Sequence, residues 1–293
     1  MKKLFTLSFL VMISILGNAQ IKKVSYRGAF APAPTPAWTD GWTNFDPNNA
    51  VYPSPSSAPA GGSLISVPSS GTGTVISTNQ TWTRNNTYII RGTVYVKSGV
   101  TLTIEAGTVI FGSNAVANSC LIICKGAKLN AIGTPTQPIV FTSAFPAGFR
   151  RPGQWGGIIL LGRGSCNSTS SATSPTPSTY GLNYIEGLTE VNNNTTGEST
   201  EFGGGSTPDD DDNSGTLKYV RIEFGGYIFS QNKEINGLTL GSIGRGTTID
   251  YVQASFTNDD GFEWFGGAVN CSHLVSYRTV DDDWDTDFGF SGT

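Results

Sequence analysis

The sequence predicts an all-β fold, and within that class it favours a parallel β-helix over an antiparallel sandwich. From Thr81 onward, short runs of β-branched and aromatic residues alternate with Gly, Asn or Asp, and no window sustains a 3.6-residue apolar period. A sandwich should show two-residue Asn-Gly or Asp-Gly hairpin turns, whereas the coils of a β-helix should repeat every 20 to 30 residues, roughly. Such a repeat is present, because residues 257–263 (TNDDGFE) return as residues 279–285 (TVDDDWD).

The repeat has two competing phases. The acidic motif recurs after 22 residues, whereas Val252 matches Val275 and Phe265-Gly266 matches Phe288-Gly289 after 23. One inserted residue, accommodated as a β-bulge, would reconcile the two spacings. We therefore expect a bulge between the last two coils.

The composition fits one large β-rich domain and excludes several function classes. The 293 residues include 18 Lys and Arg against 22 Asp and Glu, and the net charge of −4 argues against a nucleic-acid partner. Only 14% of the residues are charged, and 37 glycines with 15 prolines predict frequent turns, while a hydrophobic fraction of 38% supplies a core. The single histidine, His273, excludes a multi-histidine metal site and a two-histidine acid–base relay.

Residues 1–19 are predicted to be a signal peptide. Two lysines precede an apolar run at residues 4–16, and Gly17 and Ala19 occupy the small-residue positions of a cleavage site before Gln20. The run is shorter than the ~17 residues that span a bilayer, and no later stretch approaches that length. We therefore expect an exported protein, extracellular or at the cell surface in association with the outer membrane, with no transmembrane segment after cleavage.

Residues 20–80 are predicted to form a Pro- and Ser-rich leader and an N-terminal cap. Proline is dense between Gly28 and Pro68, a pattern typical of extended chain. Within this leader, residues 38–45 (WTDGWTNF) carry three aromatic side chains that are costly to leave in water. We expect them to cap the end of the following domain; a sugar-stacking platform is the alternative.

The β-helix is predicted over residues 81–293, with loop insertions near 165–178 and 190–213. The Asp run at 209–212 in the second insertion is expected to be a solvated loop, with calcium binding as the alternative. The pattern stops at Thr293 in mid-coil, which predicts that the solenoid is truncated there or covered by a partner, and that the chain alone aggregates. The expected strands lie at residues 88–96, 101–104, 108–111, 120–124, 138–141, 156–162, 217–224, 235–240 and 248–256.

Four cysteines, an even number in a chain expected to be exported, allow three disulfide pairings. Cys120 and Cys124 lie on one predicted strand, ~13 Å apart at ~3.3 Å per residue, so they cannot bridge each other. Pairings that involve Cys166 and Cys271 stay open, and buried free thiols are the alternative.

Seven further segments carry a recognisable pattern of turn and strand residues: 101–110 (TLTIEAGTVI), 126–129 (GAKL), 138–143 (PIVFTS), 154–162 (QWGGIILLG), 217–226 (LKYVRIEFGG), 234–240 (EINGLTL) and 259–267 (DDGFEWFGG). They resemble motifs of a family of exported repeat proteins of Bacteroidota. The resemblance covers about residues 38–293 and implies a right-handed parallel β-helix at the cell surface, often followed by a C-terminal type IX sorting domain, of which these residues show no sign. Some members are lipoproteins, which the lack of a cysteine after the apolar run argues against here, and the family brings no established catalytic residues.

An acidic cluster near the C-terminus is the strongest chemical signal. Eight carboxylates lie between Asp259 and Asp287, and a 22-residue coil would stack the first acidic motif on the second with strands ~4.8 Å apart. Carboxylates that close repel one another, and calcium, which takes about six to eight oxygen ligands, would relieve the repulsion. An acidic turn without an ion, or catalysis, is the alternative. The predicted calcium ligands are Asp259, Asp260, Asp281, Asp282, Asp283 and Asp285.

The catalytic alternative resembles polygalacturonase-like β-helix hydrolases, which carry an Asn-Thr-Asp motif and, about one coil later, an Asp-Asp pair. Residues 258–261 (NDDG) and 281–282 are similar in spacing but lack the middle Thr. Under this hypothesis the catalytic carboxylates, ~6.5 to 9.5 Å apart for inverting hydrolysis, are Asp259, Asp260, Asp281 and Asp282.

Two features weigh against catalysis. The Gly-His-Gly and Arg-Ile-Lys segments of those hydrolases would lie beyond Thr293, and His273 precedes the second acidic motif. A lyase would need a base beside a bound calcium, for which Arg278 and Lys233 are the candidates, although each is more typical of a surface charge.

Three aromatic residues near glycines, Trp155, Trp264 and Phe265, are expected to pack at coil corners, with sugar-binding planes as the alternative. Together these patterns predict a structural, adhesive or glycan-binding β-helix module stabilised by calcium. Its expected partner is an extracellular glycan or a cell-surface component. A polysaccharide-degrading hydrolase or lyase is the alternative function.

Overall fold

The computed structural model describes residues 28–71, 73–115, 119–168, 181–185, 188, 197–230 and 233–293. The predicted signal peptide and parts of both predicted insertions lie outside these ranges. The chain divides into two compact units after Trp38, and in the first unit the rings of Phe30 and Trp38 stack with centroids 5.7 Å apart. Within the described ranges, no helical segment has the length and apolar character needed to cross a membrane.

Two large sheets and two short hairpins contain the strands of the second unit. Sheet A contains β1 (Leu64–Val67), β3 (Gln80–Trp82), β4 (Thr87–Ile90), β6 (Thr101–Ile104), β7 (Val109–Gly112), β9 (Lys128–Ile132), β10 (Ile139–Ser143), β14 (Gly215–Glu223), β18 (Thr248–Ser255) and β20 (Cys271–Tyr277). Sheet B contains β2 (Gly73–Ile76), β5 (Thr93–Val96), β8 (Cys120–Ile123), β11 (Gly157–Leu161), β17 (Leu238–Gly241), β19 (Phe262–Phe265) and β21 (Trp284–Asp287). The antiparallel hairpins are β12 (Asn183–Tyr184) with β13 (Glu201–Phe202), and β15 (Ile228–Ser230) with β16 (Lys233–Glu234).

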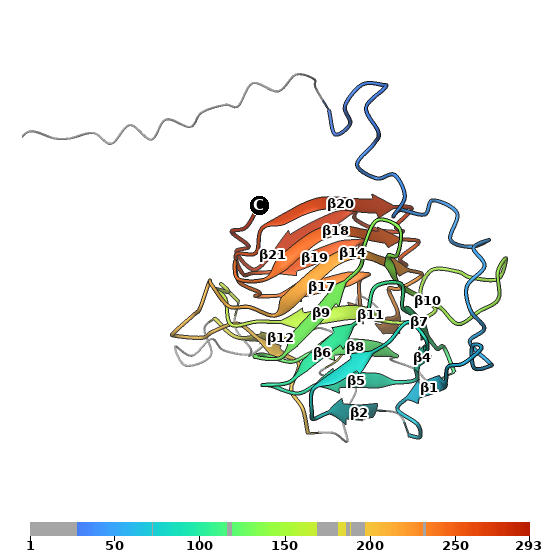
Figure 1. Ribbon diagram of the computed structural model, residues 1–293. Coiled ribbons are helices and arrows are strands. Elements are labelled where there is room, and N and C mark those ends of the chain that lie inside the picture. Colours follow the sequence, from blue (N-terminus) through green and yellow to red (C-terminus); the bar gives the residue numbers. More distant parts are fainter. Residues whose placement is uncertain are drawn as a thin grey trace, which may run out of the picture. The chain divides into compact units, whose positions relative to one another are not determined.

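The second unit is a right-handed parallel β-helix, which confirms the predicted fold class. Strands that neighbour each other in sheets A and B run parallel, and a typical pair, β4 with β7, is one coil apart in the sequence. The coils stack in chain order, from β1 and β2 at one end to β20 and β21 at the other (Figure 1). Consecutive strands such as β4 and β5 lie in different sheets, so each strand pairs with a strand of the next coil.

Sheet A has two faces that merge in the last coils. The nine-residue β14 pairs with β9 through its first half and with β10 through its second half, and β18 and β20 continue along it. The strands bend at Tyr219, Tyr251 and His273, whose φ angles are 52, 55 and 50°. This left-handed conformation costs an ordinary residue about 1–2 kcal/mol. Ring stacking at 4.5 Å between the tyrosines and 4.0 Å between Tyr251 and His273 offsets part of that cost.

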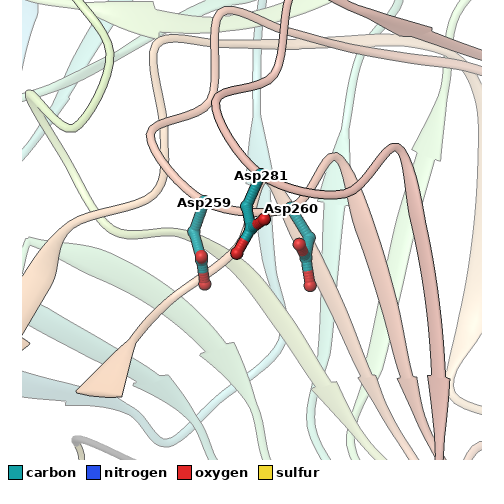
Figure 2. Close-up of side chains that lie close together, drawn as sticks. All are labelled: Asp259, Asp260 and Asp281. Atoms are coloured by element: carbon teal, nitrogen blue, oxygen red, sulfur yellow. The ribbon is translucent and has the colours of Figure 1, made fainter. Parts of the chain in front are cut away.

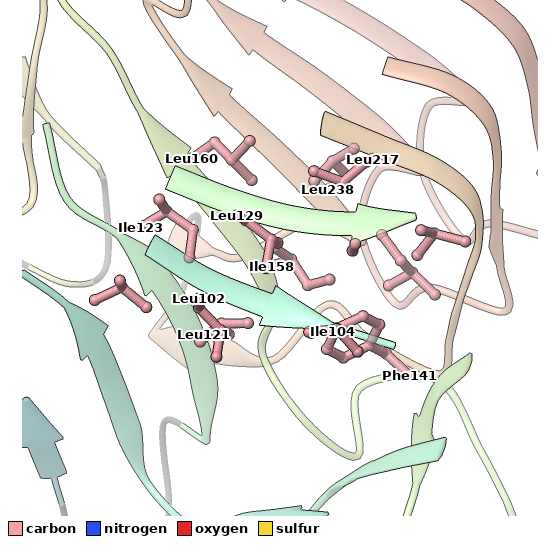
Figure 3. Close-up of a cluster of buried hydrophobic side chains, with 14 of the residues drawn as sticks. Leu102, Ile104, Leu121, Ile123, Leu129, Phe141, Ile158, Leu160, Leu217 and Leu238 are labelled. Carbon is pink, nitrogen blue, oxygen red and sulfur yellow. The ribbon is translucent and has the colours of Figure 1, made fainter. Parts of the chain in front are cut away.

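The interior of the coils is a continuous column of apolar side chains (Figure 3). Leu102, Leu129 and Ile158 are among the members with no exposed surface, and burying each such side chain contributes about 1.5–3 kcal/mol. Trp155 stacks on a core phenylalanine and is 1% exposed, so it packs at a coil corner as predicted. Gly112 makes room for it, because a Cβ atom at that position would lie 2.2 Å from the Trp155 ring.

The strand register shows that the predicted bulge is wrong. β18 pairs Val252 with Leu274 and Gln253 with Val275, and β19 pairs Phe265 with Asp287, so both coils repeat after 22 residues. The apolar alternation shifts at the left-handed bend residue in each coil, and no residue is inserted. The 23-residue match of Val252 with Val275 is therefore one of residue type alone, because Val252 lies opposite Leu274.

A second apolar cluster covers the outer side of sheet B. Ile122 and Ile159 of the sheet pack with Ile185 and with Phe202 of the second insertion. Phe202 is fully buried, and its ring lies 5.6 Å from that of Phe265. The described part of the second insertion therefore includes a cover over sheet B, where a surface loop was expected.

All four cysteine thiols are free, so the disulfide alternatives are wrong. Cys120, Cys124 and Cys166 belong to the cluster outside sheet B, whereas Cys271 packs against the main core. Two separate apolar environments therefore hold the thiols.

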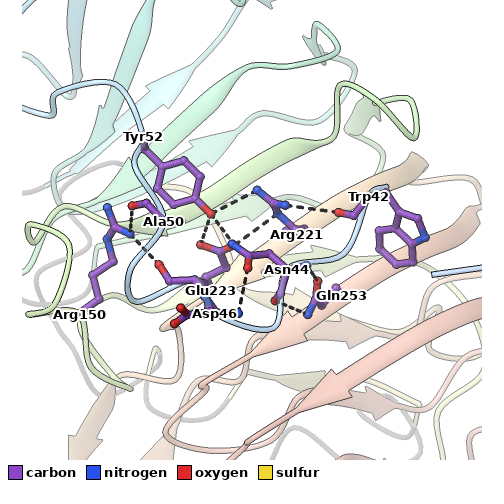
Figure 4. Close-up of polar contacts among 10 residues, drawn as sticks. Trp42, Asn44, Asp46, Ala50, Tyr52, Arg150, Arg221, Glu223 and Gln253 are labelled. Atoms are coloured by element: carbon purple, nitrogen blue, oxygen red, sulfur yellow. Dashed lines mark hydrogen bonds and ion pairs between the residues drawn. The ribbon is translucent and has the colours of Figure 1, made fainter. Parts of the chain in front are cut away.

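Residues 42–52 form a strap across the outer side of sheet A (Figure 4). Trp42 is 1% exposed and packs edge-on against the rings of Tyr219 and Tyr251. The prediction that residues 38–45 cap the end of the domain is wrong for Trp42, because its partners lie on the lateral face of β14 and β18.

Polar contacts fasten the strap to consecutive coils. The Gln253 side chain accepts a hydrogen bond from the Asn44 N–H at 2.8 Å and donates one to the Asn44 carbonyl at 2.9 Å. The Tyr52 hydroxyl lies 2.8 and 3.0 Å from the two carboxylate oxygens of Glu223, which is fully buried. Arg150 donates to the Pro47 and Ala50 carbonyls.

Two predicted boundaries also need correction. The β-helix begins at β1 and β2, before the predicted start at Thr81, so part of the expected leader belongs to the first coils. Residues 88–96, predicted as one strand, fall into β4 and β5 because the chain turns a corner at Arg91 and Gly92.

Candidate functional site: an acidic pocket

One pocket of about 330 Å³ is lined entirely by acidic residues. It lies at a coil corner, where the loops from sheet A to sheet B in the last two coils meet the β15–β16 hairpin. The lining residues are Glu234, Asp259, Asp260, Glu263, Asp281, Asp282 and Asp285.

The strand register brings the two acidic loops together. Asp259 and Asp260 precede β19, Asp281 and Asp282 precede β21, and these strands pair in parallel at a spacing of one 22-residue coil. The Asp282 N–H donates to Asp260 Oδ1 at 2.9 Å, and the Gly261 N–H donates to the Asp282 carbonyl at 2.9 Å. The predicted stacking of the acidic motifs is therefore present.

The carboxylates form two overlapping groups. Ligand oxygens of Asp259, Asp260 and Asp281 lie within 4.8 Å of one another, and their side chains point to the same side of the two loops (Figure 2). Oxygens of Asp260, Glu263 and Asp285 form a second group within the same limit. Asp260 belongs to both groups and is the centre of the site.

The two central carboxylates are strongly buried. Asp260 and Glu263 are each 6% exposed, although both carry groups that are stable in water as anions. Burial, together with the nearby carboxylates of Asp285 and Asp281, raises the pKa of Asp260 to about 6, against a smaller opposing effect of the Asp282 N–H. Burial and Asp287 also raise the pKa of Asp285.

A neutral residue that the sequence interpretation missed, Asn236, holds both central residues. Its amide nitrogen donates to Glu263 Oε2 and, at 3.2 Å, to Thr239 Oγ1. Its amide oxygen accepts from the Asp260 N–H at 3.3 Å. Asn236 stands outside the acidic motifs and 24 positions before Asp260, so only the coil spacing could have indicated it.

One predicted ligand lies outside the pocket. Asp283 Oδ1 accepts hydrogen bonds from the hydroxyls of Ser276 at 2.7 Å and Thr279 at 3.1 Å. These two hydrogen bonds hold the Asp283 side chain, which does not line the pocket. The structure adds Glu234 and Glu263 to the predicted set.

The other candidates for chemistry serve packing or loop structure. Trp264 and Phe265 are each 5% exposed, which agrees with the packing prediction and leaves no open ring face for a sugar. Arg278 lies over the Phe256 ring at 5.7 Å, and neither Arg278 nor Lys233 lines the pocket.

The Asp run at 209–212 fastens loops and is not merely solvated. Asp210 accepts hydrogen bonds from the Ser165 N–H and hydroxyl, and Asp211 pairs with Arg245 at 3.0 Å. Asp212 is buried, and burial raises its pKa.

The donor set of the pocket fits a hard divalent cation. Calcium binds oxygen ligands at about 2.3–2.6 Å, so two ligands on opposite sides of the ion lie at most about 5 Å apart. In each carboxylate group one oxygen of every residue lies within 4.8 Å of the others, close enough for all three to contact a single ion. Among the residues that the structure describes, the lining includes no His or Cys, which disfavours zinc or copper.

A family model described as a pectate-lyase-like β-helix domain matches residues 73–293. No curated protein and no solved structure matches the chain. The matched range extends from β2 to Thr293 and includes every residue of the acidic pocket. The chain therefore belongs to the pectate-lyase-like β-helix domain family.

Proposed function

We propose that this protein is an exported β-helix module whose acidic pocket binds calcium. The observation that carries the proposal is a cavity to whose lining the described residues contribute seven acidic side chains and no basic one, and in which Asp260 and Glu263 are more than nine-tenths buried. Burying ionised carboxylates is costly unless a counter-charge or hydrogen bonds compensate. A calcium ion supplies two positive charges at the place where these carboxylates converge.

The expected effect of the ion is to fasten consecutive coils to each other. Asp259 and Asp260 come from one coil corner, whereas Asp281 and Asp285 belong to the next coil. A cation bound by both corners stabilises their stacked arrangement and leaves the unfolded chain unaffected. Such linkage adds about 2.7 kcal/mol at a hundred times the dissociation constant.

Two further features support a surface or extracellular role as a structural, adhesive or glycan-binding module. The charged and apolar segments within residues 1–19 support export. The pectate-lyase-like description of the family supports carbohydrate as the ligand class. An extracellular glycan or a cell-surface component is therefore the proposed partner.

A polysaccharide hydrolase is the second candidate, favoured by one observation. A carboxyl group whose pKa is near 6, such as that of Asp260, suits a general acid. Two features argue against parts of this alternative: carboxylate oxygens that converge within 4.8 Å do not fit an inverting pair, whose carboxyl groups lie ~6.5 to 9.5 Å apart, and among the described residues no Lys or Arg base lines the pocket for a lyase. We therefore place calcium binding first.

Isothermal titration calorimetry of the purified full chain tests the proposal. Wild type is expected to bind calcium, and the double variant Asp259→Asn/Asp281→Asn to bind it at least about tenfold more weakly, because two ligand charges are lost. Asp283→Asn is the matched control, since it removes the same charge from the same loop outside the pocket. Absence of calcium binding by wild type, or an equal loss in the control, would overturn the proposal.

Incubation with uronic-acid and neutral polysaccharides separates the two candidates. A binding module retains the polymer without shortening it. Release of reducing ends by wild type, abolished by Asp260→Asn with no change in melting temperature, would establish the hydrolase instead.

A further inference from the structure

Asn236, Asp260 and Asp282 occupy the same position in three successive coils. Each lies two residues before a strand of sheet B, and those strands pair Leu238 with Phe262 and Phe262 with Trp284. One hydrogen bond repeats along the column: the Asp260 N–H donates to Asn236 Oδ1, and the Asp282 N–H donates to Asp260 Oδ1. In this respect Asn236 and Asp260 are equivalent.

The other half of the side chain differs between the two coils. In the first coil it is an amide, and Asn236 Nδ2 donates to the Glu263 carboxylate. Its neighbours fix this orientation, because the Asp260 N–H requires an acceptor on one side and Glu263 requires a donor on the other. Asn236 is 2% exposed, so the carboxylate has this amide donor in a dry environment.

One coil later the corresponding pair has no such donor. Asp260 takes the place of Asn236, and Asp285, which pairs with Glu263 in the sheet, takes the place of Glu263. Their oxygens, with those of Glu263, lie within 4.8 Å of one another. An ionised Asp260 offers only oxygen where Asn236 offers an N–H.

We infer that the residue at this column position decides whether a coil corner requires a cation. The Asn236 amide supplies the positive partner of Glu263. In the next coil a calcium ion supplies it, held by Asp260, Glu263 and Asp285 together with Asp259 and Asp281 of the overlapping group. This inference rests on the proposed function and deepens it, because it names the ligands and the residue whose exchange would remove the need for an ion.

Reciprocal exchange of the two side chains tests the inference on the full chain. Asp260→Asn restores an amide donor toward Asp285, so its melting temperature in chelator should exceed that of wild type, and its calcium-induced shift should shrink. Asn236→Asp places a second carboxylate against Glu263, so it should melt lower in chelator and gain a larger calcium-induced shift. Asp283→Asn is the control and should follow wild type in both buffers.

Calorimetry adds a readout that does not depend on melting. Asp260→Asn should bind calcium at least about tenfold more weakly than wild type, because a shared ligand charge is lost. If wild type binds calcium but Asp260→Asn keeps its affinity and gains no stability in chelator, the inference is overturned and the proposed function stands. If wild type shows no calcium response, the proposed function fails whatever the variants do. Should Asn236→Asp not fold even in calcium, Asp260→Asn decides alone.

Discussion

The contact between the Tyr52 hydroxyl and the buried Glu223 carboxylate is expected to hold the strap on the β-helix, and removal of the hydroxyl tests this role. Tyr52→Phe removes one oxygen atom and keeps the ring, which lies under the Arg150 guanidinium at 4.8 Å. The lost hydroxyl contacts the carboxylate of Glu223, which has no exposed surface. The Arg221 side chain, whose Nε lies 3.3 Å from Glu223 Oε1, keeps the carboxylate partly compensated in the variant.

The magnitude follows from the kind of contact. A hydrogen bond to a charged group contributes about 1.5–3 kcal/mol, and the packing of the ring is unchanged. We expect the strap to lose about 2 kcal/mol of docking free energy, which is about a 30-fold rise in its open population. Because the strap can open without unravelling the coils, the global unfolding free energy should change by less than this amount.

Native-state hydrogen exchange measures the opening directly. The Asn44 N–H donates to Gln253 only while the strap is docked, so its protection factor should fall about 30-fold in Tyr52→Phe. Tyr184→Phe is the control, because Tyr184 is 38% exposed and lies outside the strap, and it should leave the Asn44 protection unchanged. Equal protection of Asn44 in wild type and Tyr52→Phe would refute the role assigned to the hydroxyl.

Three further outcomes are expected. Because the pKa of Asp260 is raised to about 6, the folded state binds the proton of this carboxyl group more tightly than the unfolded state does. In chelator, the free energy of unfolding measured with urea should therefore fall as the pH rises from about 4 to 7. A rise over that window would contradict the raised pKa of Asp260. Burial raises the pKa of the thiols of Cys120, Cys124 and Cys271 to about 12. A thiol reagent should therefore react with them only after denaturation, and fast reaction with the native protein would show that the thiols are accessible. Gly112→Ala should lower the free energy of unfolding by about 1–3 kcal/mol, seen as a lower urea midpoint, because its Cβ atom overlaps the Trp155 ring; an unchanged midpoint would disprove that overlap.

The coil repeat was predictable because short segments of the sequence carry its pattern. Strands such as residues 101–104 stand between turn residues, and the acidic motif at 257–263 returns after one coil of the final register. The stacking of Asp259 and Asp260 on Asp281 and Asp282 follows from that period alone. The competing 23-residue spacing is a coincidence of residue type, because Leu274 and Val275 are both apolar and Val252 lies opposite Leu274.

The remaining features depend on contacts between distant segments. The strap reaches Gln253 from Asn44, a separation of 209 residues, and nothing in its composition distinguishes a lateral cover from an end cap. Phe202 lies within polar, Gly-rich sequence, so no pattern of neighbouring residues indicates that its side chain is buried over sheet B. Asn236 is uncharged, and its place beside Glu263 depends on a coil of different length from the 22-residue repeat.

Crystals of the full chain grown with calcium, and a second set grown with chelator, test the calcium site most directly. With calcium, we expect an anomalous difference peak whose distances to carboxylate oxygens of Asp260 and its neighbours are about 2.3–2.6 Å, and no peak with chelator. A pocket that holds only water in calcium-grown crystals, with the carboxylates arranged as they are in chelator, would contradict calcium binding at this site.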